Sequence, residues 1–366
     1  MNKRKTLIKV TKSFLPPIDD YILYLQKIWE SHHLTNHGPL VEELETKLRT
    51  YLGVKHLFFV SNGTIALQIA IKALGLHGEI ITTPFSYVAT TSTIVWEGCQ
   101  PVFVDIDPLT LCIDPNLIEA AITEQTSAIL ATHVYGIPCA VEQIQAIADK
   151  LDLNVIYDAA HTFGGKYKDK AISSYGDIST LSFHATKVFH TAEGGAIITD
   201  DDDLAHDVNY MRNFGHKDEE EFWGLGINGK NTELHAAMGL CILPKVPELI
   251  AKRKLISEHY DGNFSGSAIS KPERPEESNY NYAYYPVIFK TEMSLIKVVK
   301  ELNENNIYPR RYFFPSLNKL SYIQTTHMPV SEDISTRILC LPLSPYLTEQ
   351  DVDQISSIIL DVINGI

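Results

Sequence analysis

Short apolar runs rich in β-branched residues recur between residues 57 and 199, and helical patterns lie between most of them. Each run is continuous rather than alternating, which is typical of strands buried on both faces of a sheet. Strands that alternate with helices predict an α/β fold with a mostly parallel sheet covered on both faces. The predicted strands are residues 57–60, 80–82, 102–104, 128–130, 154–157, 180–183 and 195–198.

The pattern changes after residue 200. A long helical pattern covers Thr232 to Tyr260, with bends expected at Pro244 and Pro247. Residues 261–281 hold glycines, prolines and polar residues, which predicts a linker. From Tyr282 onward the pattern indicates a smaller α+β unit with strands at 284–289 and 338–341. We expect an N-terminal segment (1–35) packed on the body, a large α/β domain (36–245) and a small C-terminal domain (246–366).

Composition and charge narrow the function classes. The chain has 366 residues, 45% hydrophobic and 21% charged, which is typical of a soluble globular protein. A formal net charge of −14 disfavours a nucleic-acid or anionic-membrane binder, although backbone amides can still hold a small anion. The five cysteines are scattered without a CxxC pair, and no apolar stretch follows the basic residues 1–5. We therefore expect a cytoplasmic protein without a membrane span.

The sequence Ser61-Asn62-Gly63-Thr64 follows a predicted buried strand and opens a predicted helix. Free amides and a hydroxyl at a helix start can cradle a phosphate, although a plain helix cap with a tight turn fits equally. No GxGxxG or GxxxxGK[ST] motif supports nucleotide binding by the commonest loops. No metal site stands out either, because the fourteen histidines are dispersed.

Two charged residues follow neighbouring strands. Asp158 ends the strand at 154–157, where open α/β sheets bind ligands, and could hold a protonated ring nitrogen or merely cap a turn. Lys187 comes just after the strand at 180–183 and could be a Schiff-base amine, although most lysines are surface cations. With the phosphate turn, Tyr87 and Ser182, these residues supply the parts that a pyridoxal phosphate site needs.

Eight ordered segments resemble one family over nearly the whole chain, the sugar aminotransferases of the DegT/DnrJ/EryC1/StrS group. They are 61–67 (SNGTIAL), 84–90 (PFSYVAT), 101–107 (PVFVDID), 133–138 (HVYGIP), 158–160 (DAA), 182–187 (SFHATK), 193–199 (EGGAIIT) and 226–239 (GINGKNTELHAAMG). The resemblance implies fold type I of the aspartate aminotransferase superfamily, with a seven-stranded sheet, a small α+β C-terminal domain and pyridoxal 5′-phosphate as cofactor.

The same resemblance implies roles for individual residues. Lys187 would form the Schiff base and move the proton, Asp158 would pair with the pyridine nitrogen, and Tyr87 would stack on the ring. His161 would lie near the phenolic oxygen, where the family often has glutamine, so only its location is carried over. The phosphate would be held by Thr64, the amide of Gly63, and Ser182.

Weaker assignments concern the substrate and a second subunit. Asn228 resembles the asparagine that reaches the phosphate of the neighbouring subunit, which implies a homodimer with shared active sites. His184 is a candidate contact for the sugar. Arg310 and Arg311 are candidates for binding a carboxylate or a diphosphate, although solvated arginines are as common.

The activity implied is transfer of an amino group from L-glutamate to a nucleotide-linked keto-sugar, with pyridoxamine phosphate as the intermediate form. Segments 157–164 and 182–195 resemble enzymes that act at C4 of dTDP-4-keto-6-deoxyglucose, in surface-glycan or O-antigen synthesis. Alternatives are a C3 aminotransferase, or the C4 reaction on a UDP- or GDP-linked sugar. Lys187 argues against the C3 dehydratases, in which histidine replaces this lysine.

Two other classes of protein stay open at this point. A cofactor-free regulator or scaffold could use the same fold, but both Asp158 and Lys187 are present. A nicotinamide-dependent sugar oxidoreductase would need a glycine fingerprint that the chain lacks.

Overall fold

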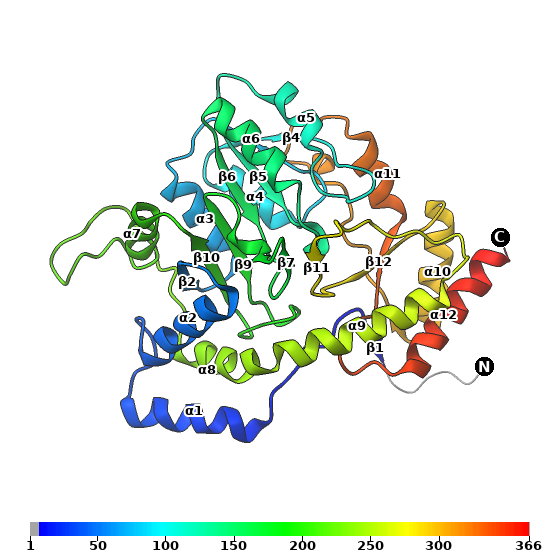
Figure 1. Ribbon diagram of the computed structural model, residues 1–366, viewed down its shortest axis with the longest axis horizontal. Helices are drawn as coiled ribbons and strands as arrows, with labels where there is room; N and C mark the ends of the chain where they lie inside the picture. Colours follow the sequence, from blue (N-terminus) through cyan, green and yellow to red (C-terminus); the bar gives the residue numbers. More distant parts are fainter. Residues whose placement is uncertain (1–6, 366) are drawn as a thin grey trace.

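A seven-stranded sheet forms the centre of the molecule in a computed structural model that describes residues 7–365 (Figure 1). The basic residues 1–5 singled out above lie outside the described residues. The strand order is β2-β10-β9-β6-β5-β3-β4. The strands are β2 (His56–Val60), β3 (Glu79–Thr82), β4 (Gln100–Phe103), β5 (Thr126–Thr132), β6 (Asn154–Asp158), β9 (Ile178–Ser182) and β10 (Gly195–Thr199).

The predicted mostly parallel sheet is confirmed, and each predicted strand overlaps one strand of it. The pairs β4–β3, β3–β5, β5–β6 and β6–β9 are parallel, whereas β10 runs antiparallel to both β9 and β2. Because the parallel strands all end at one edge, the residues that follow β5, β6 and β9 meet there.

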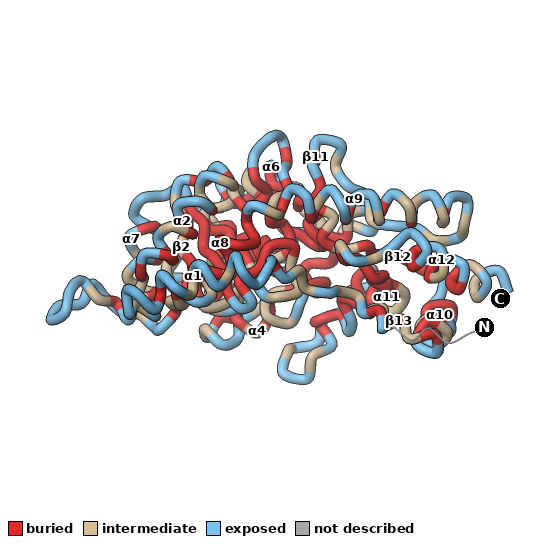
Figure 2. Tube along the Cα trace, turned by 90° about the horizontal axis from the view of Figure 1, so that it is seen from below, coloured by how far each residue is buried: buried red, intermediate tan, exposed pale blue. Residues whose placement is uncertain are grey.

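Helices cover both faces of this sheet (Figure 1). On one face, α3 (Gly63–Ala73), α4 (Val88–Trp96) and α7 (Asp202–Met211) bury apolar side chains against alternate strand residues such as Ile156 and Ile197. On the other face lie α2 (Pro39–Leu52), α6 (Val141–Leu151) and α8 (Glu233–Ile242). The tube in Figure 2 shows this buried interior as a continuous band between exposed outer segments. Burial on both faces explains the unbroken apolar runs.

One long helical path leads from the large part of the chain to the small one. The predicted helix over Thr232 to Tyr260 is present as α8, a 3₁₀ turn (Leu243–Lys245) and α9 (Val246–Asn263). The predicted boundary at residue 245 falls at this turn. By length and composition alone Glu233–Asn263 could span a membrane, but half of its most apolar window is buried. Its first half packs against α1 (Ile18–Ser31) and α2, as a core helix does.

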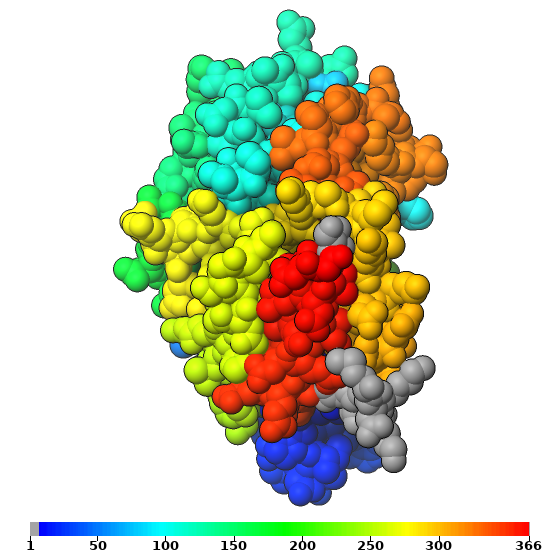
Figure 3. Space-filling view, turned by 90° about the vertical axis from the view of Figure 1, so that its right-hand side faces the viewer, coloured from blue at the N-terminus to red at the C-terminus, as the bar shows by residue number. Residues whose placement is uncertain are grey.

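The C-terminal part has its own core. Strands β12 (Tyr285–Ile288) and β14 (Ile338–Leu341) pair antiparallel, close to the two predicted strands. Helices α9, α10 (Glu292–Glu304) and α12 (Glu349–Asn364) pack on them, and Figure 3 shows α12 in red between its two neighbours. The N-terminal strand β1 (Ile8–Lys9) runs parallel to β13 (Ile307–Tyr308) in this part.

The predicted linker at 261–281 is only partly correct. Helix α9 continues to Asn263, and β11 (Ser278–Asn279) pairs with β7 (Lys166–Tyr167), which in turn pairs with β8 (Lys170–Ala171). Gly262 therefore lies in a helix, and the end of the predicted linker is a strand attached to the large part of the chain. Pairing with a distant strand is a tertiary effect that local composition does not reveal.

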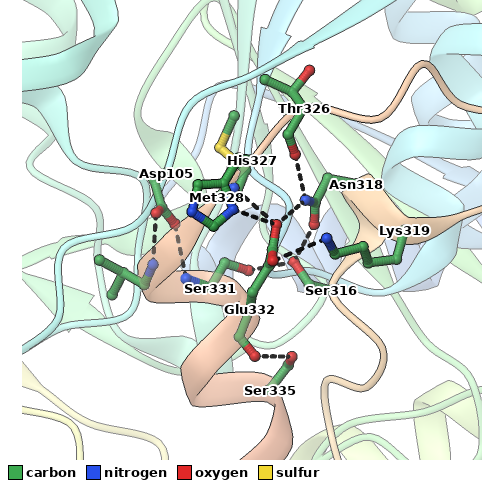
Figure 4. A network of polar contacts seen from close by, with 11 residues as sticks. Asp105, Ser316, Asn318, Lys319, Thr326, His327, Met328, Ser331, Glu332 and Ser335 are labelled. Carbon is green, nitrogen blue, oxygen red and sulfur yellow. Dashed lines mark hydrogen bonds and ion pairs between the residues drawn. The ribbon is translucent and has the colours of Figure 1, made fainter.

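A polar network fastens the C-terminal part to the end of β4 (Figure 4). Asp105 accepts hydrogen bonds from the backbone amides of Val330 and Ser331, in the first turn of α11 (Pro329–Arg337), at 2.8 and 2.9 Å. Glu332 accepts from the amide of Met328 at 2.9 Å and from the side chain of Asn318 at 2.7 Å. The bond from Met328, together with Lys319 and Asn318, lowers the pKa of Glu332 to about 2. The network thereby holds residues 316–335 beside the end of β4.

Candidate active site

A cavity of about 240 Å³ opens at the carboxyl ends of β5, β6 and β9. Its walls come from the start of α3, the start of α4, the turn after β9 and two segments of the C-terminal part. It is therefore built between the central sheet and the smaller unit. The residues that line it include Gly63, Thr64, Tyr87, Asp158, His161, Ser182, His184, Lys187, Glu193, Tyr284, Arg310 and Tyr312.

The turn between β2 and α3 is shaped to receive an anion. Asn62 caps the helix, and its side-chain oxygen accepts a hydrogen bond from the amide of Ile65 at 2.9 Å. The amides of Gly63 and Thr64 open α3 and have no acceptor within it. Ser182, at the end of β9, faces the same turn, because a Cβ built on Gly63 would lie 3.1 Å from the Ser182 Cβ. The helix cap is therefore present, and the anion cradle at the free amides stays a prediction.

Asp158 is buried at the end of β6, and both of its carboxylate oxygens accept hydrogen bonds. Oδ2 accepts from Thr90 Oγ1 at 2.7 Å, and Oδ1 accepts from the amide of Ala160 at 3.1 Å. Ser86 Oγ lies 2.7 Å from Thr90 Oγ1 and 2.9 Å from Thr132 Oγ1. Since the Thr90 proton goes to Asp158, the hydroxyls must donate in one direction, from Thr132 through Ser86 and Thr90 to the carboxylate.

Lys187 lies in the turn that follows β9, on the same edge of the sheet. Its amide donates to the carbonyl of His184 at 2.9 Å, which closes the turn. Its side-chain amine is 6.0 Å from the centre of the Tyr284 ring, contributed by the C-terminal part. The amine thus lies in the same cavity as Asp158, at the next strand end.

His161 is buried among aromatic rings in the wall of the cavity. Its Nδ1 accepts a hydrogen bond from the amide of Tyr135 at 3.2 Å, and its Nε2 lies 3.3 Å from the hydroxyl of Tyr312. Burial lowers the pKa of His161 well below 6.5, and the charges of Lys187 and Arg310 lower it further. The neutral ring must carry its proton on Nε2, because Nδ1 is an acceptor.

Comparison with known proteins decides the family. The DegT/DnrJ/EryC1/StrS aminotransferase family matches residues 18–360. The chain is 40% identical to a dTDP-4-amino-4,6-dideoxy-D-glucose transaminase of Shigella dysenteriae, over 97% of this chain and 99% of that protein. A transaminase of the same name from Escherichia coli is also 40% identical, covering 96% and 98% of the two chains. This chain belongs to the DegT/DnrJ/EryC1/StrS aminotransferase family.

More distant relatives of this aminotransferase act on other nucleotide sugars. A GDP-perosamine synthase of Caulobacter vibrioides is 32% identical over 92% of both chains. Among solved structures, DesI in the presence of its TDP-sugar product superposes with a TM-score of 0.94 at 30% identity, covering 99% and 95% of the two chains. The predicted family and fold type I architecture are thus confirmed.

The cavity of the aminotransferase brings together most of the residues singled out from the sequence. Tyr87, the residue that precedes α4, lines the cavity with a half-exposed ring 6.2 Å from that of Tyr312. His184 is exposed at its rim, with Nδ1 2.8 Å from Thr186 Oγ1. The assigned contacts of these side chains with cofactor and sugar stay predictions.

Asn228 and Arg311 lie apart from this cavity in the single chain. Asn228 is exposed on the segment after α7, where its side-chain oxygen accepts from Lys230 at 2.7 Å. Its predicted contact with a neighbouring subunit stays a prediction. Arg311 does not line the cavity at all, because its guanidinium is held by Glu292 at 2.7 Å.

Sequence reasoning missed several residues of the site. Thr90 lies three positions after Tyr87 on the first turn of α4, inside a recognised segment, but its bond to Asp158 was not foreseen. Tyr284 and Tyr312 come from the C-terminal part, and no motif marked them. Their place in the cavity depends on how the two parts of the chain pack together.

Proposed function

We propose that this aminotransferase uses pyridoxal 5′-phosphate to move the amino group of L-glutamate to C4 of dTDP-4-keto-6-deoxy-D-glucose. The products would be 2-oxoglutarate and dTDP-4-amino-4,6-dideoxy-D-glucose. The observation that carries the chemistry is the shared cavity of Lys187, Asp158 and the anion-binding turn. The choice of sugar rests on near-full-length identity of 40% to two transaminases named for this product.

The residues of the cavity fit the proposed cofactor. Gly63, Thr64 and Ser182 would hold its phosphate, because all three line the cavity at the start of α3, where backbone amides are free. Asp158 would face its ring nitrogen, and Tyr87 would cover one side of the ring. When bound, this group supplies an electron-withdrawing ring that stabilises negative charge on the reacting carbon.

Gly195 gives a direct test of the phosphate turn. A Cβ at this position would lie 2.5 Å from the carbonyl carbon of Asn62 and 2.8 Å from the amide nitrogen of Gly63. We expect Gly195→Ala to push this turn out of place and to weaken pyridoxal phosphate binding about tenfold or more. Absorbance titration of the apoprotein measures this. Gly262→Ala is the control, since its Cβ would meet nothing within 4 Å; equal affinities in the two variants would contradict the prediction.

Lys187 would act as the base and acid of the reaction. Its amine can take the proton from the α-carbon of the donor and return a proton during the transfer, because it projects into the cavity from a closed turn. In the second half of the reaction the direction is reversed, and the proton is delivered to C4 of the sugar. The carbonyl oxygen of the sugar leaves as water.

His161 would take the place that glutamine often occupies in the family. Its Nε2–H is a fixed donor, because the amide of Tyr135 occupies Nδ1. Since burial lowers its pKa well below 6.5, His161 stays neutral across the neutral pH range and does not titrate during the reaction. It can therefore share its proton between Tyr312 Oη and an oxygen of the cofactor.

The aminotransferase would work as a homodimer with shared active sites. Residues 213–230 project from the body beside α7 (Figure 1), and Asn228 lies on this projection, outside the cavity of its own chain. Five large apolar side chains on the projection are exposed, namely Phe214, Phe222, Trp223, Leu225 and Ile227. A projecting apolar segment of this kind fits a subunit interface.

We further propose that the protein is a cytoplasmic enzyme of O-antigen or lipopolysaccharide synthesis.

The decisive experiment uses the purified protein with pyridoxal phosphate, L-glutamate and dTDP-4-keto-6-deoxy-D-glucose, and determines the product by NMR. We expect an amine on C4 with the gluco configuration. An amine on C3 would overturn the proposed position of amination. If this sugar received no amine but a GDP- or UDP-linked keto-sugar did, the proposed nucleotide would be wrong. A protein that binds no pyridoxal phosphate would overturn the whole proposal.

A further inference from the structure

Two neighbouring arginines near the site have opposite surroundings. The guanidinium of Arg311 donates to Glu292 Oε1 at 2.7 Å and to the carbonyl of Thr336 at 2.9 Å. It also stacks on the ring of Phe314 at 3.6 Å. Its charge is therefore neutralised within the C-terminal part, and its role is to hold that part together.

Arg310 instead points its charge into the cavity. Its guanidinium carbon lies 4.4 Å from the centre of the Tyr312 ring, and among residues 7–365 it forms no ion pair. Asp158, one of the two acidic residues in the cavity wall, is already bonded by Thr90. The other, Glu193, faces His184 at 3.6 Å. A guanidinium presents five donors, so its natural partner here is an oxyanion that comes from outside the chain.

The backbone of Arg310 is fixed independently of its side chain. Its amide donates to the carbonyl of Cys340 at 3.1 Å, and the amide of Cys340 donates back at 2.8 Å. Cys340 belongs to β14, in the buried core of the structure. A change of the Arg310 side chain therefore leaves the wall of the cavity in place, which makes this residue suitable for substitution.

Contacts through aromatic rings connect Arg310 to the reacting lysine. The ring of Tyr312, beneath Arg310, lies 5.4 Å from the ring of Tyr284, and Lys187 Nζ is 6.0 Å from that second ring. The charges of Arg310 and Lys187 both lower the pKa of His161, which lies beside these rings. Arg310 is thus the second cation on the side of the cavity where the amino group reacts.

We propose that Arg310 binds a carboxylate of the amino-acid donor and so selects that donor; this rests on the proposed transaminase function. The anions that enter this site are the carboxylates of the donor and the diphosphate of the sugar nucleotide. The donor carboxylates are one and three carbon–carbon bonds from its reacting carbon. The diphosphate is attached at C1, across the hexose ring from C4. A planar guanidinium near Lys187 therefore suits the carboxylate.

The donor carboxylates and the sugar diphosphate enter the site in different half-reactions, so their binding can be measured separately. Holoenzyme is mixed either with L-glutamate alone or with dTDP-4-amino-4,6-dideoxy-D-glucose alone. In each case the cofactor absorbance follows a single half-reaction. We expect Arg310→Gln to raise the glutamate concentration for half-maximal rate about 10- to 100-fold, and to leave the amino-sugar half-reaction within about twofold. Arg310→Lys keeps the positive charge but lacks the paired N–H donors of the guanidinium, and it should recover part of the lost glutamate affinity.

A binding measurement complements the kinetics. Calorimetric titration of the holoenzyme with glutarate, which has both carboxylates but no amine, should show affinity that Arg310→Gln loses. Arg311→Gln is the matched control, and we expect it to lower the melting temperature while keeping glutamate and glutarate affinity.

Two results would overturn the inference: unchanged glutamate affinity in Arg310→Gln, or an equal or larger loss in the amino-sugar half-reaction, which would assign Arg310 to the diphosphate. Wild-type holoenzyme that reacts with neither substrate would reject the proposed function instead.

Discussion

Replacing Lys187 by alanine is expected to abolish transamination, with a loss on the order of 10⁴-fold or more in turnover. The amine lies in the cavity on the turn after β9, and it combines nucleophile and base in one side chain. The amine lies 6.0 Å from the centre of the Tyr284 ring and forms no ion pair among residues 7–365, so the fold should not depend on it. Turnover with L-glutamate and the keto-sugar measures the effect, and the melting temperature confirms that the variant is folded.

A surface lysine provides the control for this variant. Lys150, on α6, is exposed, pairs with Glu119 at 2.9 Å and does not line the cavity, and Lys150→Ala should keep full activity. Added ammonium or methylamine should restore part of the Lys187→Ala activity, because a small amine can enter the space left by the side chain and carry the proton. Activity within about 100-fold of wild type without added amine would refute the assigned role.

The sheet was predictable because burial on both faces leaves a direct mark on the sequence. Strands such as β5 and β6 are continuous apolar runs, and their ends place the following residues at one edge. The direction of β10, antiparallel to its neighbours, was not predictable from the same kind of run. Hydrophobic pattern reports burial and not strand direction, which depends on the connection between strands.

Some residues of the site were likewise predictable from the sequence, and others were not. Asp158 and Lys187 were found because each directly follows a strand, so chain order alone brings them together. Tyr284 and Tyr312 were not found, because they reach the cavity only through packing of the C-terminal part. Arg310 and Arg311 were indistinguishable in the sequence, and only the placement of Glu292 and Tyr312 separates their roles.

Asp158→Asn is expected to lower the single-turnover rate with L-glutamate about 10²- to 10³-fold, because it removes a negative charge from the carboxyl end of β6. The surrounding hydrogen bonds make the change more than a loss of charge. Oδ1 accepts from the amide of Ala160 and Oδ2 accepts from Thr90, so an asparagine NH₂ must face one of two donors. The backbone amide cannot turn, and the NH₂ group will therefore face Thr90.

The hydroxyl chain then has to reverse. Thr90 would accept from the new NH₂ group, and its own proton would have to turn toward Ser86, whose proton now points at Thr90. Thr90→Val tests the hydroxyl chain alone, since it keeps the charge of Asp158 and removes one hydrogen-bond donor. We expect the single-turnover rate with L-glutamate to fall about tenfold. Thr90→Ser keeps the hydroxyl and should stay near wild type. If Asp158→Asn reacted within about fivefold of wild type, the negative charge at this strand end would not serve the chemistry.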